Sequence, residues 1–405
     1  GYLREPQSTG SYAALAAIAI QSNQNDQHGG QGVPNFDCAM AQGVAKSFAR
    51  LYRRKLRDAL EDVLDSEDET ELARQATEAG EEATGHPARL EIDAERFDEA
   101  VCAALVGTGR LDEKAAASIV RRARRRAAES TDRDTFQAME GFVHNLNTMH
   151  SRAGAQTPFS SINYGTDTSP EGRMVIRNIL LAEDAGLGHG ETPIFPIHIF
   201  KVKEGVNYNP GDPNYDLFQL SCRVSAKRLF PNYVFLDSPF NLQYYRPGHP
   251  ETEVATMGCR TRVMGNFYDP EREIAYSRGN LSFTSINLPR LAIESKGDEA
   301  LFYEKLDAMM EMVAQQLLDR FEIQASKRVY NYPFLMGQGV WLDSDRLGPN
   351  DEVREVLKHG TLSIGFIGLA ETLTALYGHH HGESDEMQQK GLAIVRHMRE
   401  FCDAK

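Results

Sequence analysis

The most informative part of the sequence is Met257-Gly258-Cys259-Arg260-Thr261-Arg262, followed further along the chain by Arg278-Gly279-Asn280-Leu281. A buried structural cysteine normally has apolar neighbours. Cys259 instead stands between a glycine and two arginines, in a stretch too polar and irregular for a core strand. The pattern therefore indicates a thiol held on a loop beside cationic groups, where thiols react.

The segment that follows has the pattern of a strand. Residues 282–289 read Ser-Phe-Thr-Ser-Ile-Asn-Leu-Pro, with alternating and β-branched side chains that end at a proline. A cysteine loop, an amide at Asn280 and then a strand is the layout expected of a reactive site.

Further short apolar runs alternate with helical patterns on both sides of this stretch. The runs predict buried strands at 159–164, 194–200, 233–236 and 283–288, and the helical patterns cover 215–228, 299–325, 368–376 and 387–401. Strands that alternate with helices predict an α/β fold with a largely parallel sheet. Periodicity alone does not distinguish an open sheet from a closed barrel.

The first 150 residues have a helical texture. Residues 11–21 and 45–64 predict helices, separated by a break at His28-Gly29-Gly30. An acidic, alanine-rich segment at 66–98 predicts helices interrupted at Gly80, Gly85 and Pro87. The five arginines within 121–126 are typical of a solvated helix face that balances this acidic segment.

Charge and cysteine usage exclude several classes of protein. The 405 residues contain 44 Lys+Arg and 58 Asp+Glu, a net charge of −14, which argues against general nucleic-acid binding. An anionic substrate would need a local positive island, for which Arg260, Arg262, Arg278, Lys227 and Arg228 are candidates. The five cysteines are odd in number and include no CxxC pair, which excludes a zinc ribbon and favours reduced thiols.

No segment predicts insertion into a membrane. The apolar run 13–20 is short and follows no basic region, so it is not a signal peptide. We therefore expect a cytoplasmic protein.

Motifs that keep their order over most of the chain resemble the large subunit of anaerobic (class III) ribonucleoside-triphosphate reductases. Residues 50–140 resemble this family least. The segments that carry the resemblance are 2–6, 21–31, 34–37, 156–159, 211–216, 257–262, 286–290, 297–300 and 363–368.

The resemblance implies a specific architecture. It implies a ten-stranded α/β barrel of two parallel five-stranded halves, with Cys259 on a finger loop through its centre. Residues 1–150 would be a mainly helical part of this domain with dimer and effector contacts, and 151–405 the barrel itself. The family's ATP cone and its C-terminal glycyl-radical and zinc region have no match here, so we expect a central fragment of a longer protein.

The resemblance also implies a chemistry. Cys259 would form a transient thiyl radical that takes the 3′ hydrogen of a ribose, and Asn280 would hydrogen-bond the substrate hydroxyls or formate. We expect substrate contacts from the segment His28-Gly29-Gly30-Gln31, from Ser160 and Ser161, and from Arg260. The structural alternatives are turn chemistry for Asn280, caps and loop bonds for the amide-rich segment 21–31, and capping for the serines.

Cofactors and partners follow from the same resemblance. They are ribonucleoside triphosphate substrates, dNTP and ATP effectors, a glycyl radical outside this chain, formate or a thiol as reductant, a second copy in a homodimer, and a radical-SAM activating enzyme. Zinc would belong only to the C-terminal region that is absent here. We expect no metal site in this chain and read the His379-His380-His381 run as surface, since adjacent histidines cannot all face one ion.

Three alternatives remain open at this point. The Arg121–Arg126 patch could contact effector phosphates. The chain could belong to a glycyl-radical enzyme of the pyruvate formate-lyase type, although those commonly have adjacent cysteines where Gly258 stands here. It could also be a nucleotide-binding regulatory fragment without catalysis, which the presence of both Cys259 and Asn280 argues against. Cys38 does not match the second active-site cysteine of formate-using members.

Overall fold

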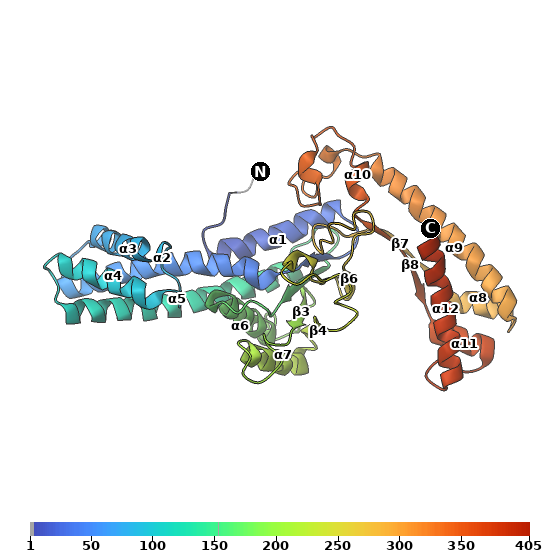
Figure 1. Cartoon of the computed structure of the whole chain (residues 1–405), viewed down its shortest axis with the longest axis horizontal. Helices are drawn as coiled ribbons and strands as arrows, with labels where there is room; N and C mark the ends of the chain where they lie inside the picture. The colour runs from blue at the N-terminus through green and yellow to red at the C-terminus, as the bar shows by residue number, and fades with distance from the viewer. Residues whose placement is uncertain (1–3, 153) are drawn as a thin grey trace. The chain divides into compact units, whose positions relative to one another are not determined.

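The computed structural model describes residues 4–152 and 154–405, which divide into two compact units. The first unit comprises residues up to 25, 30–265 and 273–276, and the second comprises 26–29, 266–272 and 277–405. Figure 1 follows the order of their helices and strands along the chain. Tyr2 and Leu3 of the first family motif lie outside the described residues.

The first unit is an α/β unit with helices before and between its strands. Its helices are α1 (Thr9–Asp26), α2 (Phe36–Leu64), α3 (Thr70–Thr84), α4 (Ala94–Gly107), α5 (Glu113–Thr148), α6 (Pro170–Ala185), α7 (Tyr215–Arg228) and the short 3₁₀ helix η1 (Pro250–Thr252). Its strands are β1 (Gln31–Val33), β2 (Ser160–Tyr164), β3 (Ile197–Val202), β4 (Asn232–Phe235), β5 (Ala255–Met257) and β6 (Thr261–Val263).

Strands β1 to β4 form a parallel sheet in that order, as the alternation of strands and helices predicts. Because successive side chains of a strand point to opposite faces, Ile162 and Tyr164 lie on the face that packs against α1, α2, α5, α6 and α7. Ser161 and Asn163 point to the other face. The sheet therefore has a helix-covered face and a second face that carries polar groups.

The C-terminal part of α2 and the N-terminal part of α5 pack with α3 and α4 around a separate apolar core, visible as the blue-to-cyan bundle of Figure 1. The predicted helix break at Gly80 is wrong. Gly80 is buried inside α3, where a Cβ would lie 2.7 Å from the ring of Phe97. The glycine serves close packing, and α3 ends instead at Gly85, whose φ of 79° closes the helix.

The core of the first unit also contains a buried polar contact. The Nδ1 atom of His198 on β3 shares a hydrogen bond of 2.9 Å with the hydroxyl of Tyr164. The Nε2 atom of the same ring lies 3.4 Å from Oε2 of Glu183 on α6. All three side chains are fully buried. Burial raises the pKa of Glu183 to about 8 and lowers the pKa of His198 to about 3, so both groups are neutral near pH 7.

We expect Glu183→Gln to change how the stability of the protein depends on pH. The folded state keeps its proton up to about pH 8, whereas an unfolded glutamate releases it near 4.5, so folding is progressively disfavoured as pH rises through this window. The variant lacks this penalty, and its advantage should grow by up to about 1.4 kcal/mol per pH unit between pH 5 and 8. Urea unfolding of both proteins across this range measures the difference, and parallel curves would contradict the assignment.

The second unit consists of two parallel strands and the helices packed on them. Strands β7 (Asn280–Asn287) and β8 (Thr361–Ile367) pair directly. The helices are α8 (Leu288–Ser295), α9 (Glu299–Ala325), α10 (Arg354–Leu357), α11 (Leu369–Tyr377) and α12 (Asp385–Ala404), with short 3₁₀ helices η2 (Val329–Asn331) and η3 (Ser344–Arg346). Residues Ile286, Phe302, Leu306 and Ile394 lie in the core between β7, α8, α9, α11 and α12.

The described residues do not show a closed ten-stranded barrel. They form one sheet of four strands and two of two strands, and none of the three closes on itself. The described residues form an α/β fold in which the named strands pair in parallel, except for the antiparallel pair β5–β6. Within residues 4–152 and 154–405, no helix has both the length and the apolar character needed to span a bilayer.

Candidate active site

Cys259 lies at the tip of a short antiparallel hairpin. Strands β5 and β6 pair Met257 with Thr261, and the residues between them form the turn. Gly258 has a φ of 62°, in the region that favours glycine, so it supplies the reversal that aims the next residue outward. The sequence predicted a loop here, and the structure shows that the loop is the tip of a hairpin with the Cys259 thiol exposed.

The hairpin rests on the second face of the four-stranded sheet. The side chain of Asn163 on β2 donates from Nδ2 to the carbonyl oxygen of Thr256 at 2.7 Å and accepts at Oδ1 from the Thr256 N–H at 3.0 Å. Its Nδ2 also lies 3.1 Å from the carbonyl oxygen of Val33 on β1. One buried amide thus joins the root of the hairpin to two strands of the sheet.

Glycines let the hairpin approach the sheet closely. A Cβ on Gly30 would lie 3.0 Å from Cα of Gly258 and 2.7 Å from the ring of Phe159. A Cβ on Gly32 would lie 3.2 Å from Cα of Met257 and 3.3 Å from the carbonyl oxygen of Thr256. The expected substrate residue Gly30 therefore has a clear structural reason to lack a side chain.

The predicted contact residues Gln31, Ser160 and Ser161 are all buried in the first unit. Asn23 on α1 donates a side-chain hydrogen bond to Gln31, whose N–H donates to the carbonyl oxygen of Phe159 at 2.8 Å. The hydroxyl of Ser160 donates to the carbonyl oxygen of Pro158 at 3.1 Å. Ser161 alone of the two serines shares the face of Asn163, so strand geometry favours it over Ser160 as a group near the hairpin.

The other predicted contact residues are Arg260, His28 and Gly29. Arg260 is exposed beside Cys259 at the tip of the hairpin. His28 and Gly29 belong to the second unit, where the exposed His28 ring lies 5.4 Å from the ring of Phe283 on β7. Their contact with a substrate stays a prediction, as it does for Arg260 and the buried serines.

Asn280 begins β7 in the second unit, half-buried. Its Oδ1 accepts hydrogen bonds from the hydroxyls of Thr361 and, at 3.5 Å, Ser363 on the neighbouring strand β8. Because the oxygen is occupied by these hydroxyls, the amide nitrogen is oriented away from them and can donate to another group. Neither β8 nor its two hydroxyls was predicted as part of the site.

A hydrogen-bonded cluster is formed by polar residues that precede β7 and β8 in the sequence: Arg272, Arg278, Asp343 and His359. Asp343 accepts from the guanidinium of Arg272 at 2.7 and 2.9 Å and lies 3.1 Å from Nε2 of the buried His359. Arg278 donates from Nε to the carbonyl oxygen of His359 at 3.0 Å. Hydrogen bonds from Arg272 hold the pKa of Asp343 well below its usual range, so its carboxylate is ionised at neutral pH, whereas burial lowers the pKa of His359 and favours its neutral form.

The family motif at 34–37 has a structural role in the first unit. The buried carboxylate of Asp37 accepts from the N–H groups of Gly165, Thr166 and Asp167 at 2.8 to 3.1 Å. Partial desolvation by the surrounding protein, with the neighbouring Asp37 and Asp167 carboxylates, raises the pKa of Cys38 to about 12, although part of the residue is exposed to solvent. Cys38 therefore stays a protonated thiol at neutral pH.

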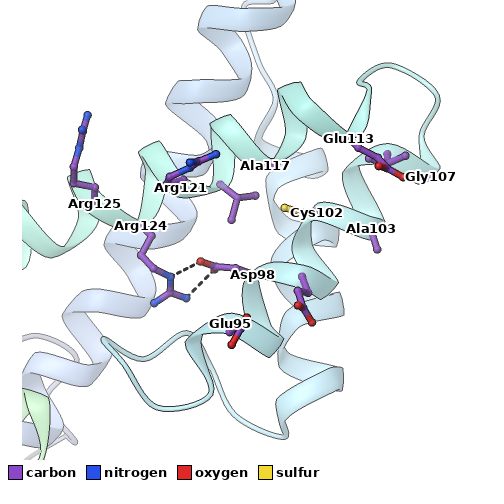
Figure 2. Close-up of a pocket in the computed structure, with 13 residues that line it drawn as sticks. Glu95, Asp98, Cys102, Ala103, Gly107, Glu113, Ala117, Arg121, Arg124 and Arg125 are labelled. Carbon is purple, nitrogen blue, oxygen red and sulfur yellow. Dashed lines mark hydrogen bonds and ion pairs between the residues drawn. The ribbon is translucent and has the colours of Figure 1, made fainter.

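A large surface groove lies in the helical part of the first unit, at α4 and α5. Figure 2 shows this groove of about 1210 Å³ between α4 and α5, with carboxylates such as Glu95 on one side and Arg121 and Arg125 on the other. Arg124, the centre of the arginine patch, forms two hydrogen bonds with Asp98 and two more with the carbonyl oxygens of Arg89 and Leu90. Its guanidinium also lies 5.1 Å from the ring centre of Tyr52.

We expect Arg124→Ala to destabilise the helical end of the first unit. The change removes the cationic partner of the partly buried Asp98 carboxylate, which keeps the hydrogen bond from Tyr52, and removes a cation–π contact, at a cost of about 2–3 kcal/mol. Arg125→Ala is the matched control on the same helix, because Arg125 has only an exposed pair with Glu129 at 3.9 Å. Urea unfolding should give a lower midpoint for the first variant alone, and equal midpoints would show that the solvated-face interpretation holds for Arg124 as well.

Three residues of the candidate site escaped prediction from the sequence: Asn163, Thr361 and Ser363. Asn163 could have been suspected, because it is an amide between Ile162 and Tyr164 in an otherwise apolar strand. Thr361 and Ser363 gave no signal, since hydroxyls are ordinary in strands. Within the described part of the chain, no group of three or more His, Cys, Asp or Glu side chains is placed to hold a metal ion.

Comparison with known proteins gives one consistent result. A family model described as anaerobic ribonucleoside-triphosphate reductase matches residues 1–405. The Escherichia coli K12 protein of that description is 34% identical over 281 residues, which is 68% of this chain and 38% of that protein. The phage T4 protein is 33% identical over 263 residues, 63% of this chain and 42% of that protein.

Solved structures give a more distant likeness. The anaerobic ribonucleotide reductase of Thermotoga maritima with citrate in its active site is 12% identical, with a TM-score of 0.46 over 93% of this chain and 52% of that chain. The matched part of this chain covers less than half the length of these curated relatives.

Proposed function

This chain belongs to the anaerobic ribonucleoside-triphosphate reductase family, and from this premise we propose that it forms the catalytic core of an enzyme that reduces ribonucleoside triphosphates to 2′-deoxyribonucleoside triphosphates for DNA synthesis. The observation that carries the proposal is the family match over the whole chain, together with an exposed cysteine at the tip of a hairpin seated on a parallel sheet. The closed barrel of the family, with Cys259 on its finger loop, is part of the proposal.

Cys259 is the proposed hydrogen-abstracting residue. As a thiyl radical, its sulfur forms an S–H bond while the C3′–H bond of the ribose breaks homolytically, so that the unpaired electron moves to C3′. The exposed position of Cys259 suits this step, because the sulfur must reach a bound sugar. A glycyl radical outside this chain would supply the unpaired electron, and formate or a thiol would supply the two electrons of the net reduction.

Asn280 is the proposed hydrogen-bonding residue for the ribose hydroxyls. Its oxygen accepts from the hydroxyl of Thr361, which leaves the amide nitrogen to donate to a hydroxyl as its C–O bond breaks. An amide adds no charge, so it can serve both the neutral substrate hydroxyl and the departing water. Substrate contacts from His28, Gly29, Gly30, Gln31, Ser160, Ser161 and Arg260 belong to the same proposal.

Partners and regulation are also proposed. We infer a homodimer, nucleotide effectors bound by residues 1–150, and a radical-SAM activating enzyme. All five cysteines lie in the described residues and are free thiols, which supports a reducing compartment such as the cytoplasm. The groove of Figure 2 is not assigned to an effector, because Arg124 on its wall is engaged by Asp98.

Activation of the longest encoded protein that contains this sequence tests the proposal. After anaerobic activation, we expect CTP or ATP to be converted to the deoxynucleotide. A glycyl radical seen by electron paramagnetic resonance without deoxynucleotide formation would overturn it. Conversion of pyruvate and coenzyme A instead would favour the pyruvate formate-lyase type, and nucleotide binding without any radical would favour a regulatory fragment.

We expect the 405-residue chain by itself to fold, to dimerise and to be catalytically silent. No Arg-Val-Cys-Gly-Tyr type motif occurs between Gly1 and Lys405, so the chain has no recognisable residue to store the radical. Size-exclusion chromatography with light scattering measures the dimer. Incubation with the activating enzyme followed by electron paramagnetic resonance measures the radical, and a glycyl doublet from this chain alone would contradict the expectation.

A further inference from the structure

The root of the Cys259 hairpin depends on a side chain rather than on a backbone ladder. Strand β5 pairs with β6 but is joined to β2 through the amide of Asn163, which bonds both the N–H and the carbonyl oxygen of Thr256. The amide thus replaces one residue of a neighbouring strand. Asn163 is fully buried, so these bonds are made without competition from water.

Two residues before β5, Glu253 forms an ion pair with Lys201 on β3, whereas the other contacts of β5 and the hairpin turn with the sheet are close van der Waals approaches with little hydrogen bonding. Gly30 and Gly32 on the sheet side meet Gly258 and Met257 on the hairpin side, and the hydroxyl of Ser161 lies 3.5 Å from the Thr256 carbonyl oxygen. Such packing limits how near the hairpin can lie but does not fix its position along the sheet. The directional bonds to Thr256 come from Asn163.

We propose that Asn163 is a positioning residue for Cys259: by clamping both polar groups of the Thr256 backbone, it fixes the hairpin three residues before the reactive sulfur. That this position matters for hydrogen abstraction rests on the proposed function. That the amide holds the hairpin rests on the bonds alone. A thiyl radical acts over a short distance, so a displaced hairpin lowers the turnover number while substrate affinity is largely retained.

The first test uses the chain itself and needs no activity. Cys38, Cys102, Cys222 and Cys402 are changed to serine, and a nitroxide label is attached to Cys259. We expect Asn163→Ala to narrow the electron paramagnetic resonance lines, since the label gains mobility. A spectrum unchanged from the parent would overturn the proposal.

Asn207→Ala is the matched control. Asn207 is equally buried and also makes three backbone hydrogen bonds, to the carbonyl oxygens of Gly165 and Lys201 and from the N–H of Lys203, but none to the hairpin. Asn207→Ala should lower the free energy of unfolding, measured in urea, about as much as Asn163→Ala does, without increasing the mobility of the label. Equal mobilisation by both variants would mean that any lost buried amide loosens the unit, which would also overturn the proposal.

A second variant displaces the hairpin without removing a hydrogen bond. Gly32→Ala adds a methyl group 3.2 Å from Cα of Met257, at a position whose φ is not in the left-handed region. We expect it to mobilise the label as well, whereas Gly141→Ala, whose added methyl group meets nothing within 4 Å, should not. If Asn163→Ala fails to fold, this variant still tests the proposal: an immobile label in Gly32→Ala would show that the hairpin stays fixed after displacement from Asn163, which would overturn the proposal.

The second test measures turnover in the activated full-length protein. We expect Asn163→Ala to lower kcat at least tenfold with KM changed less than threefold, and Asn207→Ala to lower kcat far less. If the label is mobilised but kcat is unchanged, Asn163 anchors the hairpin without positioning it for the reaction, and the proposal fails. If the parent protein itself makes no deoxynucleotide, the proposed function fails, while the label experiment still decides whether Asn163 holds the hairpin.

Discussion

Cys259→Ser in the activated full-length protein should form no detectable deoxynucleotide, while nucleotide binding stays within a few-fold of the parent. Serine nearly preserves the size of cysteine, and Cys259 is exposed at a hairpin tip, so the fold should not change. An O–H bond is much stronger than an S–H bond, so a serine cannot accept the radical and then take hydrogen from a sugar carbon. The measurements are product formation by chromatography and nucleotide affinity by calorimetry.

The exposed Cys222 on α7 provides the control. Cys222→Ser makes the same chemical change at another exposed thiol and should leave turnover unchanged. Measurable deoxynucleotide formation by Cys259→Ser would remove Cys259 from the mechanism. Loss of activity in both variants would indicate a general requirement for thiols.

Asn280→Ala should lower kcat by roughly 30- to 900-fold, equivalent to about 2–4 kcal/mol, with a smaller effect on substrate binding. The reason is that a hydrogen bond that strengthens as the hydroxyl leaves stabilises the transition state more than the bound substrate. Steady-state kinetics separate the two effects. An unchanged kcat with a raised KM would make Asn280 a binding group only.

Asn287→Ala is the control at the other end of β7. Asn287 accepts from the N–H of Arg290 at 3.2 Å and caps α8, so its loss should cost stability, about 1 kcal/mol, without a large change in kcat. Equal losses of kcat in the two variants would indicate that both act through the stability of the strand.

Several elements could be predicted from the sequence because local signals agree with the fold. Helices α7 and α9 begin and end as predicted, and α9 has an Asp298 cap that accepts from the N–H of Leu301. Strand β3 was predicted three residues too early. Pro196 has no N–H to give to a ladder, so pairing starts at Ile197.

Other elements depend on contacts that the sequence does not display. The break expected at Gly80 is wrong because Phe97 occupies the space beside it. Cys259 and Asn280 were singled out from their neighbours and from the family resemblance, and their roles stay predictions. Asn163, Thr361 and Ser363 have hydrogen-bond partners 81 to 93 residues away. Only the fold shows such pairs, so these supporting residues were not predictable from the sequence.

The clamp between Asn163 and Thr256 also has a kinetic meaning. It joins residues 93 positions apart, and it needs β1 and β2 already paired, since the same amide bonds Val33. Contacts of long sequence separation form late, because closing a long loop costs conformational entropy before the native contacts that offset this cost have formed. The hairpin should therefore dock as one of the last events of folding, so that the Cys259 thiol reaches its final place only when the sheet beneath it is complete.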